Sequence, residues 1–228
     1  VEKKPLQRFY PGKKVLSVGS FGCNMSCPFC QNFEISMAGE QELESVPFSP
    51  KELAKQAEAV RTRGNIGIAF TYNEPLVGYE YVRDTAREVR KRGMKNILVT
   101  NGAFTEETED AVLSYIDAMN IDLKGFTESY YKKLGGDLET VKAFIEKAVK
   151  VCHVELTTLV VPGENDSVSE MQNLAKWTAS LSCEIPLHVT RFFPRWKMQD
   201  REAADVRKVY RLAEEAGKYL NYVYTGNC

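Results

Sequence analysis

Six short apolar runs, rich in β-branched and aromatic residues, recur along the chain and limit the folds it can adopt. Their first residues lie between 23 and 51 positions apart, and most of these intervals can hold one strand and one helix. Strands and helices that alternate at this spacing predict a parallel sheet with helices packed against it. The expected strands are Val15–Phe21, Ile66–Tyr72, Asn96–Thr100, Met119–Leu123, Val154–Val161 and Pro186–Phe193. Residues Asn221–Thr225 are a candidate for a seventh strand.

The segments between these runs are predicted to be helical because their apolar residues recur every three or four positions. The predicted stripes are 53–60, 82–89, 141–148 and 206–213. Ser167 and Glu170 have the form of a capping box, which predicts a helix start at that point. The glycines expected to end helices in the left-handed conformation are Gly64, Gly93 and Gly217.

Two architectures accommodate six such βα units with right-handed crossovers: a doubly wound sheet and an open, partial barrel. A doubly wound nucleotide-binding sheet usually carries a G-x-G-x-x-G turn after its first strand. Here that strand runs into Gly22 and Cys23, and no such turn follows. We therefore predict an α/β fold of the partial, open parallel (βα)6 barrel type. No linker or low-complexity tract divides the chain, so we expect a single domain over residues 1–228.

Composition excludes several classes of protein. Hydrophobic residues make up 43% and charged residues 27% of the chain, which argues against disorder and fibrous repeats. Thirty basic and thirty-one acidic side chains give a net charge of −1, so a nucleic-acid partner is not expected. No apolar run approaches the ~20 residues of a membrane span, and Val1–Gln7 is too charged for a secretory signal. We expect a cytoplasmic protein without membrane contact.

Three of the six cysteines lie within eight residues, Cys23-Asn-Met-Ser-Cys27-Pro-Phe-Cys30, with the spacing C-x3-C-x2-C. Such crowding in a chain that begins without an export signal indicates metal binding in a reducing compartment. The number of thiols is informative, because structural zinc sites and ferredoxin-type four-iron clusters normally take four protein ligands. Three thiols around a four-iron cluster leave one iron open to an outside molecule.

The alternative is a zinc site completed by a residue distant in sequence. The candidate ligands are Cys152, Cys183, Cys228, His153 and His188. Cys152 and Cys183 stand alone in or beside apolar runs, which favours ordinary buried thiols. The chain has no second close group of cysteines, so a second cluster is not expected.

The spacing of the three cysteines, with Phe29 before the last of them, resembles the radical S-adenosylmethionine (radical SAM) superfamily. Further motifs resemble its pyruvate formate-lyase activating enzyme branch over roughly residues 14 to 195. These motifs are Gly22-Cys-Asn24, Cys30-Gln-Asn32, Thr71-Tyr-Asn-Glu-Pro75, Val99-Thr-Asn-Gly102, Asp122-Leu-Lys124 and Val160-Val-Pro-Gly163. Within the branch, the chain is most similar to the AmmeMemoRadiSam-system group. That similarity lies in Glu2-Lys-Lys-Pro-Leu6, Phe9-Tyr-Pro-Gly12 and Cys30-Gln-Asn-Phe-Glu-Ile-Ser36.

Polar residues follow or close five of the predicted strands, and the carboxyl ends of parallel barrel strands share one rim. Glu74 follows the second strand, Thr100 and Asn101 end the third, and Asp122 with Lys124 ends the fourth. Thr157 and Thr158 lie within the fifth strand, and Arg191 closes the sixth. Since the cysteines follow the first strand, we expect them to open onto the same rim. For each single residue, capping of a loop remains the alternative.

The resemblance implies a [4Fe-4S] cluster held by Cys23, Cys27 and Cys30, with S-adenosylmethionine bound beside it. Glu74 with Asn73 is the expected acceptor for the ammonium group, although Tyr-Asn-Glu-Pro replaces the family's two glycines before the glutamate. Lys124 is expected to meet the carboxylate, and Asp122 to orient Lys124 or accept from a ribose hydroxyl. The full set of expected cofactor-binding residues is Phe29, Asn73, Glu74, Thr100, Asn101, Asp122, Lys124, Thr157, His188 and Arg191.

The expected adenine slot and His188 each have a structural alternative, and one ion of the activating enzymes is not expected here. The adenine slot is expected at Phe29 and the stretch 188–193, where core packing is the alternative for Phe192 and Phe193. An ordinary hydrogen-bonded strand histidine is at least as good a reading of His188. A monovalent cation is not predicted, because Val99 stands where activating enzymes carry an aspartate.

The resemblance further implies an enzyme that cleaves S-adenosylmethionine reductively and abstracts hydrogen from a substrate with the resulting 5′-deoxyadenosyl radical. An external one-electron donor of the ferredoxin or flavodoxin type would supply the electron. The target is either a glycine of a partner glycyl radical enzyme, or a small molecule or companion-system protein. A non-catalytic iron–sulfur or zinc module for binding or electron transfer is the alternative, but such a module has no use for Glu74, Asp122 and Lys124 on one rim.

Overall fold

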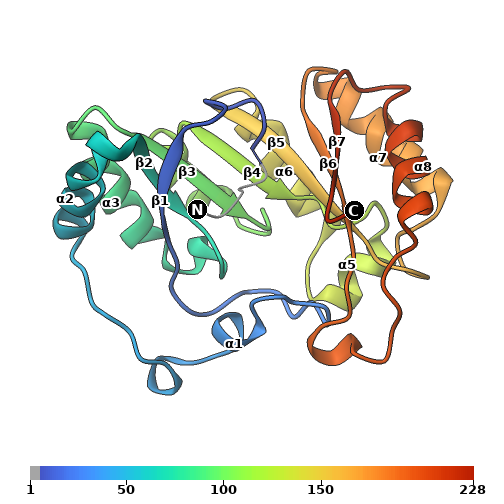
Figure 1. Ribbon diagram of the computed structural model, residues 1–228, viewed down its shortest axis with the longest axis horizontal. Coiled ribbons are helices and arrows are strands. Elements are labelled where there is room, and N and C mark those ends of the chain that lie inside the picture. Colours follow the sequence, from blue (N-terminus) through green and yellow to red (C-terminus); the bar gives the residue numbers. More distant parts are fainter. Residues whose placement is uncertain (1–5) are drawn as a thin grey trace.

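The computed structural model describes residues 6–228 and contains a seven-stranded parallel sheet whose strand order follows the chain (Figure 1). The strands are β1 (Lys14–Val18), β2 (Asn65–Phe70), β3 (Lys95–Thr100), β4 (Ala118–Asp122), β5 (His153–Val160), β6 (Leu187–Arg191) and β7 (Val223–Gly226). Within the described chain β1 pairs only with β2 and β7 only with β6, so the curved sheet stays open. The predicted open parallel α/β barrel is confirmed, and the candidate seventh strand is present.

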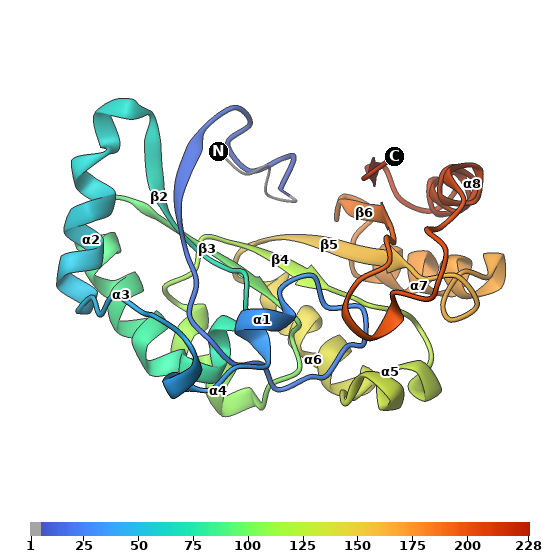
Figure 2. The same cartoon turned by 60° about the horizontal axis from the view of Figure 1, so that its bottom comes forward.

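Helices connect the strands; the longer ones lie along the outer side of the curved sheet, whereas a four-residue helix lies in the loop between β1 and β2, away from that layer (Figures 1 and 2). They are α1 (Phe33–Ser36), α2 (Pro50–Ala59), α3 (Tyr79–Lys91), α4 (Glu106–Leu113), α5 (Glu128–Leu134), α6 (Leu138–Ala148), α7 (Val168–Leu181) and α8 (Val206–Ala216). Four short 3-10 helices are η1 (Glu40–Glu42), η2 (Arg61–Arg63), η3 (Pro75–Gly78) and η4 (Trp196–Met198). Within residues 6–228, no helix combines the length and apolar character that a membrane crossing requires.

The predicted helix ends are partly correct. Gly64 and Gly93 adopt φ of +86° and +65°, as expected for left-handed closing residues. Gly217 instead has φ −62°, because the chain after α8 continues in right-handed turns. Ser167 Oγ accepts from the Glu170 amide at 3.2 Å, but the Glu170 carboxylate accepts from the Phe126 amide at 2.7 Å. The capping box is therefore only half formed, since its carboxylate holds the loop before α5.

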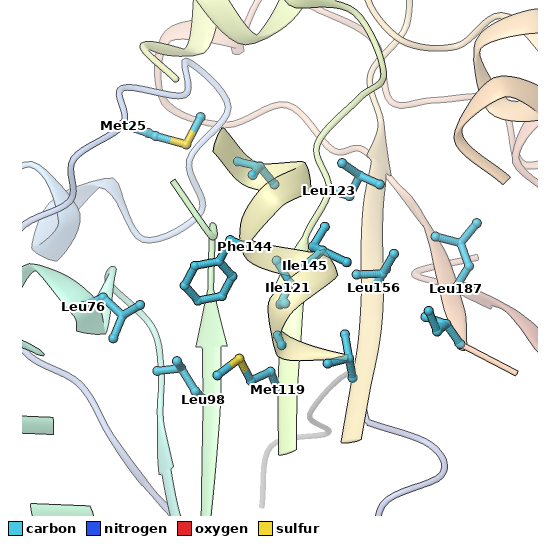
Figure 3. Packing of buried hydrophobic residues seen from close by; sticks show 14 of the residues in the cluster. Met25, Leu76, Leu98, Met119, Ile121, Leu123, Phe144, Ile145, Leu156 and Leu187 are labelled. Carbon is cyan, nitrogen blue, oxygen red and sulfur yellow. The ribbon is translucent and has the colours of Figure 1, made fainter. Parts of the chain in front are cut away.

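The main core lies between the sheet and the helices outside it. Alternate strand residues point outward and pack against apolar helix faces, as Figure 3 shows around α6. The labelled residues of that layer include Leu98, Met119, Ile121, Phe144, Ile145 and Leu156. Each of them is at most 1% exposed, so burial of these side chains supplies ~1.5–3 kcal/mol apiece before the entropy of ordering is subtracted.

A segment from the start of the chain fills the amino-terminal part of the barrel interior. Leu6, Phe9 and Val15 pack against a small cluster formed by Ala69, Ile97 and Ala118. These three buried residues occupy neighbouring positions on β2, β3 and β4. The segment therefore closes the end of the barrel opposite the carboxyl ends of the strands. Glu2–Pro5, part of a motif quoted above, lie outside the described residues.

Gly67 allows β2 and β3 to approach closely, and its replacement is expected to destabilise the sheet. A Cβ atom at Gly67 would lie 1.8 Å from the carbonyl oxygen of Lys95. We predict that Gly67→Ala lowers the free energy of unfolding by at least ~1–3 kcal/mol, the usual cost of overpacking, measured by denaturant titration. Gly78→Ala is the matched control, because nothing lies within 4 Å of its Cβ position. Equal stability of the two variants would contradict this account.

Candidate functional site

A cavity of about 590 Å³ lies at the carboxyl ends of the strands. The cysteine loop, which we define as residues 22–32 after β1, forms one wall of it. Nine of the ten expected cofactor-binding residues line this cavity together with the three thiols. They are Phe29, Asn73, Glu74, Thr100, Asn101, Asp122, Lys124, Thr157 and His188. The parallel sheet thus brings together residues that are as far as 165 positions apart in the sequence.

Arg191 is the expected site residue that the structure places elsewhere. Its Nε donates to the Ala204 carbonyl at 2.7 Å, and its guanidinium lies 4.7 Å from the centre of the Phe193 ring. It therefore holds the loop after β6 and is not among the residues that line the cavity. Core packing is the role of Phe192, which is fully buried, but not of Phe193, which is 44% exposed.

The cysteine loop is held from several sides. Ser26 donates its amide to the Leu134 carbonyl at 2.9 Å, and the Lys197 amide donates to Pro28 at 3.0 Å. Met25 is buried and packs against Gly136, where a Cβ would come within 2.7 Å of its terminal methyl group. Asn101 Nδ2 lies 3.7 Å from the sulfur of Cys23. These contacts fix the path of the chain, so the three thiols face the cavity in a defined arrangement.

The three thiols are free and all line the cavity. Burial raises the pKa of Cys23 and of Cys27, and the nearby positive charge of Lys124 acts in the opposite direction on both. Within residues 6–228, no three Cys, His, Asp or Glu side chains converge closely enough to hold a single metal ion. A four-iron cluster places each thiolate on a different iron, so its ligands need not converge on one point. Three free thiols that line one cavity are the kind of ligand such a cluster takes.

The candidate fourth ligands for zinc are scattered. Cys152 and His153 line a separate cavity of about 500 Å³ at the amino ends of β5 and β6. Cys183 and Cys228 are both exposed, so the prediction that Cys183 is a buried thiol is wrong. His188 lines the main cavity, but its Nε2 is hydrogen-bonded to Glu155. Of the five, His188 alone lines the cavity with the three cysteines.

Glu74 is a buried carboxylate, 3% exposed, that faces the cavity. Its Oε1 accepts from the Thr100 hydroxyl at 2.7 Å and the Leu76 amide at 3.1 Å, and its Oε2 accepts from the Asn101 amide at 2.7 Å. Burial raises the pKa of Glu74 to about 7, and these hydrogen bonds limit the rise. The carboxylate is thus fixed in position and gains from a nearby positive charge.

Asn73 contacts the turn between β1 and the cysteine loop with its whole side chain. Its Oδ1 accepts from the Ser20 amide at 2.9 Å, and its Nδ2 lies 3.0 and 3.1 Å from the carbonyls of Phe21 and Gly22. The residue before it, Tyr72, has φ +79°, a conformation that side chains other than glycine rarely adopt. Asn73 therefore ties the end of β2 to the start of the cysteine loop, rather than offering its amide to a ligand.

Lys124 and Asp122 form an ion pair on the cavity wall, with 2.9 Å between Nζ and Oδ2. Burial disfavours the charge on Lys124, but Asp122 and the nearby Cys27 outweigh it and raise the lysine pKa well above its usual value. The backbone amide of Lys124 donates to the Tyr131 hydroxyl at 3.0 Å. The lysine is therefore charged and held in place at neutral pH.

The far side of the cavity contains a network that sequence reasoning missed. Glu155, fully buried on β5, accepts from His188 Nε2 at 2.6 Å and from His153 Nε2 at 2.9 Å. It also accepts from the amides of Gln7 and Arg8, each at 2.8 Å. Burial alone would raise the pKa of Glu155, but these hydrogen bonds lower it to about 2. The sequence carried one signal of this network, because Glu155 is a charged residue inside a predicted apolar strand.

This network joins the amino-terminal segment to the cavity, because Gln7 and His188 both line it. Thr157, on the same inward face of β5, donates its hydroxyl to Asn120 Oδ1 at 2.7 Å. Thr190 of β6 and Tyr224 of β7 continue the lining, and the rings of His188 and Tyr224 stack with centroids 5.4 Å apart. The far side of the cavity is therefore polar but uncharged, and the charged residues that line the cavity, Glu74, Asp122 and Lys124, lie elsewhere on its wall.

The family model described as "Radical SAM superfamily" matches residues 17–177 of the chain. An uncharacterized protein of Methanocaldococcus jannaschii is 38% identical over the whole chain, which covers 68% of that relative. The pyruvate formate-lyase 1-activating enzyme of Escherichia coli is 28% identical over 70% of this chain and 66% of its own length. Among solved structures, a domain of pyruvate-formate lyase-activating enzyme from Bacteroides vulgatus has a TM-score of 0.60 at 18% identity, covering 70% of this chain and 98% of that domain.

Replacement of Glu155 tests whether this carboxylate, through His153, His188 and the amides of Gln7 and Arg8, anchors the amino-terminal segment to β5 and β6. Its pKa is lowered from 4.5 to about 2, so its contribution to stability is complete above pH ~4.5 and lost as the pH falls toward 2. The shift corresponds to about 3 kcal/mol. We predict that Glu155→Gln is less stable than wild type at pH 7 and that the difference shrinks between pH 4.5 and 2, measured by urea unfolding. A difference that stays constant with pH would contradict the proposed anchoring.

Proposed function

Because this chain belongs to the radical SAM superfamily, we propose that Cys23, Cys27 and Cys30 hold a [4Fe-4S] cluster and that the facing residues bind S-adenosylmethionine. The observation that carries this proposal is the arrangement of the cavity, where three free thiols share one site with a buried carboxylate and a charged lysine. The members of this superfamily are enzymes, and a [4Fe-4S] cluster with S-adenosylmethionine is a general property of them.

When bound and reduced, such a cluster would supply the one electron that cleaves the sulfonium of S-adenosylmethionine into methionine and a hydrogen-abstracting 5′-deoxyadenosyl radical. Cys23, Cys27 and Cys30 would hold the cluster, and because they are three rather than four, one position on it would remain for S-adenosylmethionine. Because radical chemistry must be protected from side reactions, the protein has to position the cofactor and exclude water. The amino-terminal segment and Glu155 support this by closing the opposite end of the barrel.

The methionine end is assigned to the charged lining residues. Glu74 accepts from the ammonium group, and its two oxygens are oriented by the Thr100 hydroxyl and the Asn101 amide. Lys124 binds the carboxylate group of S-adenosylmethionine, and the ion pair with Asp122 orients the lysine ammonium. Charge-assisted hydrogen bonds of this kind are among the stronger polar contacts in proteins. Asn73 acts indirectly, since it fixes the start of the cysteine loop.

The nucleoside end is assigned to the middle of the cavity. Phe29 is 7% exposed and lies in the cysteine loop, where its ring offers an apolar surface for the adenine. Thr157 is placed for a ribose hydroxyl, because its own hydrogen goes to Asn120 and its oxygen still accepts. His188, held through Nε2 by Glu155, presents its remaining ring atoms to the same space. An external one-electron donor is required.

We propose a glycine of a partner enzyme as the hydrogen donor. The support is the similarity to pyruvate formate-lyase 1-activating enzyme over 70% of the chain. A small molecule, or a substrate of a companion system, is the second candidate. It is favoured by the polar far side of the cavity, where Gln7, His188 and Thr190 offer hydrogen bonds that the methylene group of a glycine does not need. An electron paramagnetic resonance doublet with a glycyl radical enzyme, at one 5′-deoxyadenosine per radical, would decide for the glycine; turnover of a small molecule would decide against it.

The cysteines are expected to determine iron content. After anaerobic reconstitution the protein should bind about four irons, and Ala at Cys23, Cys27 or Cys30 should abolish this binding. Cys152→Ala and Cys183→Ala are the controls and should keep the iron, because neither residue lines the cavity. Iron analysis and the absorption spectrum measure the outcome. Stoichiometric zinc with no cleavage of S-adenosylmethionine would overturn the proposal.

The affinity for S-adenosylmethionine is expected to depend on the ionisation of Glu74. Since its pKa is raised to about 7, the carboxylate carries a proton at lower pH, and affinity should fall about tenfold per pH unit below that value. Glu74→Gln should weaken binding at pH 8 by about 10- to 150-fold and remove this pH dependence. Lys124→Met should weaken binding by a similar factor but keep the pH dependence. Equilibrium titration of reconstituted protein with unchanged iron content gives these values, and unchanged affinity in both variants would refute the assignment.

A further inference from the structure

We infer that the outer side of the cysteine loop is the docking surface for an acidic one-electron carrier protein, an inference that rests on the proposed cluster. The surface consists of Phe33, Arg195, Trp196 and Lys197, which we call the basic-aromatic patch. Figures 1 and 2 both show the loop after β6, which carries η4, lying against the segment that contains the cysteine loop and α1. None of the four residues lines the cavity.

The patch has a flat aromatic centre. The rings of Phe33 and Trp196 stack with centroids 5.7 Å apart and an interplanar angle of 9°, although they come from segments 163 positions apart. Both side chains are partly exposed. Trp196 adopts φ +48°, which is an outlier for a bulky residue and is tolerated only where its surroundings fix it. Stacked, partly exposed aromatic rings of this kind are typical of the centre of a protein interface.

Positive charges flank this centre. The Arg195 guanidinium lies 5.7 Å from the centroid of Phe33, and the Lys197 ammonium lies 4.3 Å from that of Trp196. Both side chains are exposed, and neither forms an ion pair with a side chain that the structure describes. Residues 191–201 carry four basic side chains and one acidic one, against a net charge of −1 for the whole chain. The unpaired cations therefore favour a partner whose contact surface carries carboxylates.

The position of the patch favours an electron carrier among acidic partners. Phe33 follows Cys30 by three residues, and the Lys197 amide bonds to the carbonyl of Pro28, between Cys27 and Cys30. Electron transfer falls steeply with distance, so a donor must dock close to the cluster. The inner side of the cysteine loop faces the cavity assigned to S-adenosylmethionine and substrate, which leaves the outer side for the donor. One electron passes from the reduced carrier to the oxidised cluster, and no bond or proton is exchanged.

Electron-carrier complexes are small and transient, and their association rates depend on charge steering and salt. The test uses reconstituted holoprotein and a photoreduced acidic flavodoxin as the probe, with reduction of the cluster followed by stopped-flow absorbance. In the double variant Arg195→Glu, Lys197→Glu the second-order rate at low salt should fall about tenfold or more, and its salt dependence should weaken. Titration with oxidised flavodoxin measures binding independently of turnover, and the double variant should bind flavodoxin more weakly than wild type does.

Three controls separate docking from other effects. Dithionite should reduce wild type and variant equally, because a small reductant needs no docking surface. Lys51→Glu reverses an exposed charge on α2, away from the cysteine loop, and should leave the flavodoxin rate unchanged. The neutral pair Arg195→Gln, Lys197→Gln should give an intermediate rate. Unchanged flavodoxin rate and affinity in the Glu variant, or a parallel loss with dithionite in both variants, would overturn the inference. Failure of dithionite-driven cleavage in wild type would instead refute the proposed function.

Discussion

Parallel pairing in chain order is the constraint on which the rest of this structure depends. Because each strand pairs with the next in the same direction, the carboxyl ends of all seven strands meet at one edge. Glu74, Thr100, Asp122 and Thr157 come from four consecutive strands or the turns after them, and they line one cavity only because of this register. A shift of one residue in any strand would turn its inward side chains outward.

Two buried carboxylates of the interior behave in opposite ways, and the difference follows from their donors. Glu155 accepts two backbone amides and two histidine rings, which satisfy its charge within the protein and lower its pKa to about 2. Glu74 accepts two amides and one hydroxyl but no histidine ring, so the effect of burial prevails and its pKa is about 7. A carboxylate whose charge is incompletely compensated is the one that gains from a cationic ligand. Glu155 organises the cavity, and Glu74 is available to a bound molecule.

Most of the fold could be predicted from the sequence, because strands and helices were set by local apolar periods. The short helices α4 and α5, of eight and seven residues, were not predicted because their stripes span barely two turns. Phe29 and His188 were assigned through the resemblance, whereas the grouping of Glu74, Thr100, Asn101, Asp122 and Lys124 followed from their positions at strand ends, which parallel topology converts into proximity. Arg191 was assigned to the cavity by the same argument, but the loop after β6 supplied a nearer acceptor in Ala204. Contacts made by the amino-terminal segment could not be predicted, since no periodicity links Gln7 to Glu155.

That last contact bears on how the chain reaches its native state. Gln7 and Glu155 are 148 positions apart, and His188 lies a further 33 residues along the chain. The carboxylate that accepts from the amides of this segment, and the histidine that holds it, therefore exist only once β5 and β6 have been made. Contacts of such high sequence separation close late and slow the folding of a domain. On a ribosome, Gln7 and Arg8 would emerge before β5 and β6 and would wait while the sheet grows beside them. They would enter the barrel only when its interior has been built around the place they are to fill.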